Sequence, residues 1–138
     1  MTASISLASF ISADFVGLFE FYSSTFDLPE VVELHSAIFR GADASGITIG
    51  FSAPVVYEML NIQDWAEPKG TAQYLTFEVP SDDAVTAATE RAVANGARLL
   101  HDPYETYYGA YQSVLADPDG NVFRINHFRV AAAAGGDG

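Results

Sequence analysis

Cysteine is absent from the sequence, and positive charge is scarce. Without cysteine the chain can form neither a disulfide framework nor a thiol nucleophile. Only six Lys and Arg oppose eighteen Asp and Glu, so the formal net charge is −12. This charge would repel the phosphates of nucleic acid, and we expect no nucleic-acid partner. A cationic or neutral small molecule is compatible with it, although acidity in many proteins serves only solubility.

Long apolar runs are lacking too. None approaches the roughly 20 residues that a membrane-spanning helix requires. The N-terminus shows no charged segment followed by an apolar one, which is the pattern of a secretory signal. We therefore expect a cytoplasmic protein that makes no contact with membranes. The 138 residues, 49% of them hydrophobic, are sufficient for a domain with its own core.

Two segments have the periodicity of amphipathic helices. In residues 13–29 the apolar side chains recur at helical spacing after Asp14, which can cap the N-terminus of the helix. In residues 81–96 a similar apolar stripe follows Ser81 or Asp82, either of which can act as the N-cap. Each predicted helix therefore has a start signal and one apolar face to bury.

Strand-like runs surround each helix in the same order, which we read as strand, helix, strand, strand, strand. Three runs, at residues 4–12, 30–41 and 46–53, occur in the first half, and four runs, at residues 72–80, 97–104, 110–117 and 121–128, occur in the second. Repetition of a whole unit indicates a duplicated architecture. We predict an α+β fold of two βαβββ modules with curled mixed sheets.

The domain boundaries follow from this repeat. Module one comprises residues 4–53, module two comprises residues 71–128, and residues 54–70 form the linker between them. Together they are predicted to make a single domain over residues 1–130. The Ala- and Gly-rich end, residues 131–138, has no periodicity and is predicted to be a disordered tail.

The sequence "DPDGN", residues 117–121, lies between the last two predicted strands. Pro118 fixes one φ angle, aspartate side chains can accept hydrogen bonds from nearby backbone N–H groups, and Gly120 permits a positive φ. The segment is therefore predicted to be a structural turn. Any function in this part of the chain is expected on the strand that follows it.

The "DPDGN" turn occurs together with two other features, a Phe-Tyr pair in the first helix ("FEFYSSTFDLP") and the duplicated βαβββ order. Together they resemble the vicinal oxygen chelate superfamily, which includes glyoxalases, bleomycin-resistance proteins and extradiol dioxygenases. The resemblance covers residues 4–128. It implies that each module curls into a cup. It also implies that the first and last strands of each module supply His, Gln or Glu ligands in the metal-dependent members.

The residues at these four positions do not suit a metal ion. Strand alternation assigns the positions to Leu7, Gly50, Tyr74 and Arg124. Leucine and glycine offer no donor, tyrosine is a rare ligand, and the guanidinium of arginine would repel a cation. The three histidines match no compact ligand spacing. We therefore predict that the protein holds no metal and no other cofactor.

The predicted inward faces of the strands supply polar side chains for a ligand. Alternation directs Thr76, Arg124 and Asn126 into the cup, because their neighbours along the strands are apolar. A partly buried Arg124 needs either an internal carboxylate, with Glu78 as the first candidate, or an anionic or carbonyl group of a ligand. The full set of candidate ligand-binding residues is Ser9, Ser52, Trp65, Tyr74, Thr76, Tyr107, Tyr108, Arg124 and Asn126.

Aromatic residues in two other segments add planar surface. The tyrosines of "HDPYETYYGAYQ", which include Tyr107 and Tyr108, suit a planar ligand, or else they seal the rim of the core or a dimer contact. Trp65 in the linker would cover the mouth of a cup or anchor the crossover. The sequence leaves both alternatives open in each case.

Three functions are compatible with this site. The first is a metal-free protein that binds a small organic molecule, in particular a planar or aromatic natural product sequestered by a homodimer, as the resemblance to antibiotic-resistance members implies. The second is a lyase, isomerase or dioxygenase acting on a small carbonyl or aromatic substrate, or a metal-free catalyst that uses Tyr74, Glu78 or His35 as acid or base. The third is a regulatory or scaffold domain that keeps only the fold. We favour the binding protein and assign no catalytic residue, since no pair of titratable groups has a compelling spacing.

Overall fold

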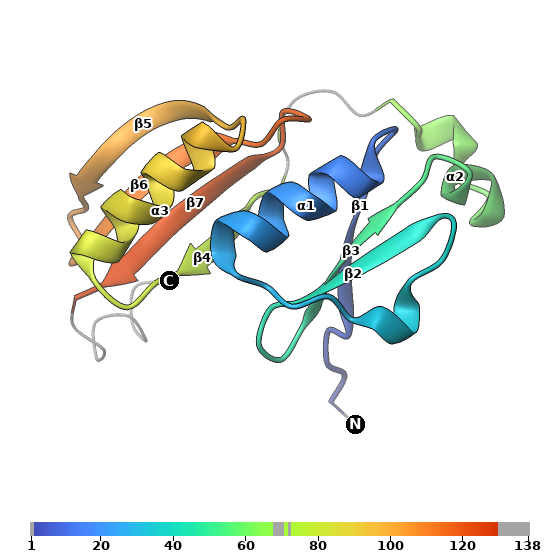
Figure 1. Ribbon diagram of the computed structural model, residues 1–138, viewed down its shortest axis with the longest axis horizontal. Helices are drawn as coiled ribbons and strands as arrows, with labels where there is room; N and C mark the ends of the chain where they lie inside the picture. Colours follow the sequence, from blue (N-terminus) through green and yellow to red (C-terminus); the bar gives the residue numbers. More distant parts are fainter. Residues whose placement is uncertain (1, 68–70, 72, 130–138) are drawn as a thin grey trace. The chain divides into compact units, whose positions relative to one another are not determined.

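The computed structural model describes residues 2–67, 71 and 73–129, and it divides into two compact units, residues 1–70 and 71–138 (Figure 1). Each unit places one long helix against a mixed sheet. This arrangement confirms the α+β class that the sequence predicts.

The first unit contains a three-stranded sheet and one long helix: β1 (Leu7–Ile11), α1 (Phe15–Phe26), β2 (Phe39–Asp43) and β3 (Thr48–Ser52). The strand order is β1-β3-β2, with β1 parallel and β2 antiparallel to β3. The helix begins after Asp14, whose side chain accepts a hydrogen bond from the backbone N–H of Gly17 at 3.0 Å. Asp14 is therefore the N-cap that the sequence predicts.

Aromatic side chains build the core between α1 and this sheet. Tyr22 is fully buried and stacks on Phe10 of β1, with ring centroids 5.6 Å apart. Phe51 of β3 is also fully buried, and its ring lies 5.8 Å from that of Tyr22. Burial of a large apolar side chain stabilises a fold by roughly 1.5–3 kcal/mol. Phe21 is buried as well, so the Phe-Tyr pair of α1 has a structural role.

The segment between α1 and β2 is not the strand that the sequence predicts. Residues 30–38 form two isolated bridges and the 3₁₀ turn η1 (Val32–Leu34), so this module has a three-stranded sheet rather than a four-stranded one. The side chains of this turn are exposed, and Val32 has an exposed fraction of 64%. Strand propensity depends on packing against a buried surface, which this segment does not have.

The second unit contains a four-stranded sheet and one long helix: β4 (Leu75–Glu78), α3 (Asp82–Ala94), β5 (Arg98–Glu105), β6 (Ala110–Ala116) and β7 (Val122–Phe128). The strand order is β4-β7-β6-β5, with β4 parallel to β7 and the other neighbours antiparallel. The helix α3 packs on β5, β6 and β7 (Figure 1). Ser81 caps it by accepting a hydrogen bond from the backbone of Ala84. The βαβββ order predicted for module two is confirmed.

The linker between the two units is partly helical. It contains the short helix α2 (Val56–Met59) and the 3₁₀ turn η2 (Gln63–Trp65). Residues 68–70 of the linker and the predicted tail, residues 131–138, lie outside the described residues. Within the part of the chain that the structure describes, no helix is long and apolar enough to cross a membrane.

The "DPDGN" turn is built around a buried aspartate. One carboxylate oxygen of Asp117 accepts hydrogen bonds from the backbone N–H groups of Asp119 and Asn121, at 2.8 and 2.9 Å. Gly120 has a φ of 90°, a conformation that would strain a residue with a side chain. The segment is therefore the structural turn that the sequence predicts, and β7 follows it.

Candidate functional site

Strand β7 presents polar side chains on the sheet face opposite α3. Phe123 and Ile125 are fully buried on the α3 side. Because side chains alternate along a strand, Arg124 and Asn126 point to the other side. In the parallel pairing of β4 with β7, Thr76 lies opposite Arg124. The alternation predicted for these two strands is confirmed.

Arg124 is the centre of a hydrogen-bonded cluster on this face. Its Nε donates to the hydroxyl of Thr76 at 2.9 Å. Its Nη1 donates to the hydroxyl of Tyr108 at 3.3 Å and to Oε1 of Gln112 at 3.4 Å. The guanidinium also lies over the ring of Tyr74, 5.0 Å from its centroid, which is a cation–π contact. These contacts fix the orientation of the guanidinium plane.

Gln112 extends this arrangement to a second tyrosine. Its Oε1 accepts a hydrogen bond from the hydroxyl of Tyr108 at 3.0 Å, and its Nε2 donates to the hydroxyl of Tyr104 at 2.7 Å. Gln112 is buried, so its polar atoms require these partners. The six residues that we call the Arg124 cluster are Tyr74, Thr76, Tyr104, Tyr108, Gln112 and Arg124.

No carboxylate in the described ranges forms an ion pair with Arg124. Glu78, the first candidate from the sequence, accepts hydrogen bonds from Nδ2 of Asn126 and from the backbone N–H of Phe128, both at 2.8 Å. The Nη2 of Arg124 has no hydrogen-bond partner among these residues either. A partly buried cation in this situation favours an anion or a carbonyl oxygen from outside the chain.

Asn126 lies beneath this face rather than on its surface. Only 1% of the residue is exposed, and it lies opposite Gln112 in the pairing of β6 with β7. Its Nδ2 donates to Glu78, and its Oδ1 is buried with no partner among the described atoms. The structure therefore gives Asn126 a supporting position beside the cluster, and direct contact with a ligand stays a prediction.

The two serines predicted to bind a ligand belong to the first unit, whereas the Arg124 cluster belongs to the second. Ser9 lies opposite Gly50 in the pairing of β1 with β3. A Cβ at Gly50 would lie 2.5 Å from the hydroxyl of Ser9 and 2.7 Å from the ring of Phe39. Ser9 therefore fills the space next to the glycine. Ser52, at the end of β3, is buried.

The two predicted aromatic contacts outside the strands are exposed. Trp65 in η2 has an exposed fraction of 78%, and Tyr107 is fully exposed. The ring of Tyr107 makes an edge contact with that of Tyr108, 5.1 Å away. Of the predicted binding residues, the structure therefore brings Tyr74, Thr76, Tyr108 and Arg124 together, with Asn126 beneath them.

The candidate binding residues chosen from the sequence leave out Gln112 and Tyr104, although Tyr104 lies in the tyrosine-rich segment, residues 101–112, that is expected to suit a planar ligand. Alternation along residues 110–116 could have identified Gln112, because its neighbour Ser113 lies on the α3 side and bonds to Thr89. Alternation could not place Tyr104 on this face. Its strand, β5, shifts register twice against β6, and the side-chain alternation is lost there.

The positions that the family resemblance assigns to metal ligands do not offer suitable donors. Gly50 has no side chain, and its space is filled. Arg124 places a permanent positive charge where a cation would bind. Among the residues that the structure describes, no three His, Asp or Glu side chains are grouped so that they could hold a metal ion. This donor set does not fit a divalent cation.

A separate ion-pair group lies just beyond the end of β7. Arg129 donates hydrogen bonds to both carboxylate oxygens of Asp82, at the start of α3, and to the carboxylate of Glu105 on β5. The hydrogen bond from Arg129 lowers the pKa of Asp82, and the two carboxylates raise the pKa of Arg129. These charges satisfy one another, so we assign the group a structural role that ties α3 to β5.

A βαβββ module and a shortened copy of it, each with a helix packed on its sheet, define a glyoxalase-type α+β protein. The family model of the Glyoxalase/Bleomycin resistance protein/Dioxygenase superfamily matches residues 8–125, and the chain belongs to this superfamily. The family resemblance found in the sequence is therefore confirmed.

Solved structures agree with this assignment. The chain is 40% identical to a glyoxalase/bleomycin resistance protein/dioxygenase family enzyme from Burkholderia phytofirmans PsJN, with a TM-score of 0.89 over 91% of this chain and 99% of that one. A glyoxalase-related enzyme from Fulvimarina pelagi shares the fold at 20% identity, with a TM-score of 0.73 and coverage of 91% and 88%. Lactoylglutathione lyase from Agrobacterium tumefaciens shares it at 16% identity, with a TM-score of 0.67 and coverage of 91% and 94%. A comparison with curated proteins found no significant match.

Proposed function

We propose that the protein binds a small organic molecule with an anionic or strongly polarised carbonyl group, held by the Arg124 cluster without a metal ion. The observation that carries this proposal is the partly buried guanidinium of Arg124, which has no ion-pair partner among the described residues. In a chain of net charge −12, a cation kept apart from carboxylates is best explained by an external anion. A hydrogen bond to a charged group contributes about 1.5–3 kcal/mol.

The other residues of the Arg124 cluster suit a ligand with a planar or aromatic body. Tyr74 lies against the guanidinium, and the hydroxyls of Tyr104 and Tyr108 are joined through Gln112. Tyrosines in this arrangement offer flat, rather stiff surfaces with polar tips. The biological role that we propose is sequestration of a planar natural product, of the antibiotic-resistance type, by a cytoplasmic homodimer. Neither nucleic acid nor a membrane is a partner in this proposal.

An enzymatic function is the second candidate. The solved structure at 40% identity is described as a family enzyme. Glu78 offers a half-exposed carboxylate whose position is held by Asn126 and by the backbone of Phe128. A positioned carboxylate can remove a proton next to a carbonyl group. In this alternative, a lyase or isomerase of the glyoxalase family would bind its small carbonyl substrate at Arg124 and use Glu78 as the base. A dioxygenase acting on an aromatic substrate is the other enzymatic form, and it would need donors beyond those described above.

A thermal-shift panel in buffer containing EDTA tests the binding proposal. The panel pairs planar aromatic carboxylates with their neutral carboxamides. We expect the carboxylates to raise the melting temperature and the amides to have little effect. Arg124→Met should abolish the shift, whereas Arg98→Met, which removes the same charge from β5, should preserve it. Amides as effective as their carboxylates would contradict anion recognition.

The enzymatic alternative has its own readout. If the protein is an enzyme of this kind, small α-keto acids in D₂O should exchange the protons next to their carbonyl group faster in its presence. NMR measures the rate of this exchange. Loss of the catalysed exchange in Glu78→Gln, with binding retained, would establish the enzyme. Exchange at the uncatalysed rate would contradict the enzymatic alternative and favour the binding function.

A further inference from the structure

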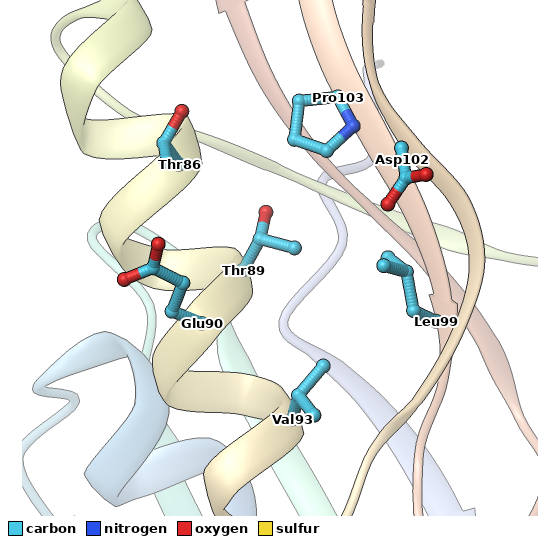
Figure 2. A pocket seen from close by; sticks show the side chains of 7 residues that line it. All are labelled: Thr86, Thr89, Glu90, Val93, Leu99, Asp102 and Pro103. Atoms are coloured by element: carbon cyan, nitrogen blue, oxygen red, sulfur yellow. The ribbon is translucent and has the colours of Figure 1, made fainter.

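A groove separates α3 from the edge strand β5 in the second unit (Figure 2). Its volume is about 350 Å³, which is near the lower end of the roughly 300–1,000 Å³ found for small-molecule sites. Figure 2 shows side chains of the helix on one side and side chains of the strand on the other. The lining residues are Thr86, Thr89, Glu90, Val93, Leu99, Asp102 and Pro103.

The groove and the Arg124 cluster lie on opposite faces of the four-stranded sheet. The hydroxyl of Thr89, which lines the groove, shares a hydrogen bond of 2.7 Å with the hydroxyl of Ser113 on β6. Ser113 precedes Val114 and follows Gln112, and Gln112 belongs to the Arg124 cluster. Because successive side chains of a strand point to opposite faces, the two sites share no surface.

The shape of β5 explains why this space is open. The strand shifts register against β6 between Leu99 and His101 and again between His101 and Tyr104. Irregularities of this kind bend a strand and increase its twist. On the helix side, Thr86 and Thr89 are too short to fill the resulting space.

The walls of the groove are largely apolar. The hydroxyl of Thr89 is used inside the protein, since it donates to the carbonyl oxygen of Val85 and bonds to Ser113. The methyl group of Thr89 is therefore the part of the side chain that lines the groove (Figure 2). Val93 and Leu99 are 44% and 36% exposed, which leaves apolar surface in contact with water. Such surface favours a ligand with an apolar body.

Two acidic residues line the groove, one on each side, and in Figure 2 the carboxylate of Glu90 is turned away from β5. Glu90 belongs to α3 and Asp102 belongs to β5. In the part of the chain that the structure describes, neither side chain forms an ion pair. Together with the net charge of −12, they give the groove a negative potential. An apolar groove with two unpaired carboxylates complements a ligand that carries one positive charge.

We infer that this groove binds a small lipophilic amine in its protonated form, such as an arylalkylammonium ion with a single ring. Asp102 contacts the ammonium group, Glu90 adds negative charge from the helix, and Val93 and Leu99 contact the apolar body. The ligand is opposite in charge to the one proposed for the Arg124 cluster, so this inference does not rest on the proposed function.

Titration of ¹⁵N-labelled protein with 2-phenylethylamine tests the inference through the backbone amide shifts. Low ionic strength is used because exposed charges are then least screened. We expect saturable shifts at the groove-lining amides of α3 and β5, and none at β4 and β7. The uncharged 2-phenylethanol should bind about two- to fivefold more weakly, the scale of an exposed ion pair. Equal affinity of the amine and the alcohol would overturn the inference.

Matched variants identify the carboxylates. Asp102→Asn should weaken binding of the amine by about two- to fivefold and leave binding of the alcohol unchanged, and Glu90→Gln should have a smaller effect in the same direction. Glu58→Gln removes the same charge from an exposed position of α2 and should have no effect. If Glu58→Gln weakens binding of the amine as much as Asp102→Asn does, the amine responds only to net charge and the inference is wrong.

Two further controls accompany the titration. All three substituted side chains are exposed, so the melting temperature should stay at the wild-type value and confirm that the fold is intact. The groove amides should not move when the protein alone is diluted. Movement on dilution would mean that a second copy of the chain covers the groove, which would also overturn the inference.

Discussion

Replacing Arg124 with methionine removes the charge from the centre of the cluster and keeps a side chain of similar length. Breaking a buried ion pair by removal of one partner costs about 3–5 kcal/mol, because the other charge stays buried and unpaired. In the described residues no carboxylate pairs with Arg124, so no charge is left behind in the variant. The cost of leaving a buried charge unpaired therefore does not apply to Arg124→Met.

The contacts that Arg124→Met removes contribute only modestly to the free energy of unfolding. They are the 2.9 Å hydrogen bond to Thr76, two longer ones to Tyr108 and Gln112, and the contact with the ring of Tyr74. A hydrogen bond contributes about 0.5–1.5 kcal/mol net, and an exposed cation–π contact contributes about 0.5–1 kcal/mol. Thr76 is exposed and can bond to water instead, and the apolar methionine offsets part of the rest. We expect the free energy of unfolding to fall by no more than about 1.5 kcal/mol.

Urea unfolding of the wild type, Arg124→Met and Arg98→Met without ligand measures this change. Affinity for the tightest aromatic carboxylate should fall by about 1.5–3 kcal/mol in Arg124→Met, and it should be retained in Arg98→Met. A loss of 3–5 kcal/mol in the free energy of unfolding would refute the reasoning. It would show that Arg124 serves an internal carboxylate, and it would remove Arg124 from the binding residues.

Four further predictions concern the frame, the charges and the metal. Gly120→Val should lower the free energy of unfolding by about 1–3 kcal/mol because of the φ of 90°, and an unchanged urea midpoint would mean that the turn is misread. Gly50→Ala should cost about 1–3 kcal/mol, since its Cβ would lie 2.5 Å from a side-chain oxygen, and it should cost more than Gly41→Ala, where the nearest contact is 3.2 Å. Arg129 lowers the folded-state pKa of Asp82 below its ordinary value of 3.8. The stability that this carboxylate contributes should therefore be complete above pH 3.8 and disappear as the pH falls through the lowered pKa. If the wild type stays more stable than Asp82→Asn in stronger acid, this prediction is wrong. Elemental analysis of purified protein should find no stoichiometric zinc, iron, nickel or manganese, and one tightly held ion per module would disprove metal-free binding.

The second module could be predicted from the sequence because its periodic apolar residues are buried in the folded protein. Val85 of α3 and Phe123 and Ile125 of β7 are all fully buried, as their spacing indicates. The first module shows where this reasoning stops. Residues 30–38 have the composition of a strand, yet Val32 is exposed and pairing is limited to isolated bridges. Whether a short apolar run becomes a strand depends on a packing surface that its own sequence does not reveal.

The site could be predicted only in part, for similar reasons. Alternation on regular strands was enough to place Thr76 and Arg124 on one face. It could not find Tyr104, because the irregular β5 breaks the alternation. It also could not decide whether Glu78 pairs with Arg124. That depends on competition from Asn126 and from a backbone N–H at the end of β7, which only the folded geometry shows.

Native mass spectrometry of the protein with the tightest aromatic carboxylate tests metal-free anion binding most directly, since one spectrum reports ligand and metal together. The account predicts a complex whose mass equals protein plus carboxylate, with no metal, and no such complex for Arg124→Met at the same concentration. A complex in which every bound carboxylate is accompanied by a metal ion, or one equally abundant in Arg124→Met, would contradict it.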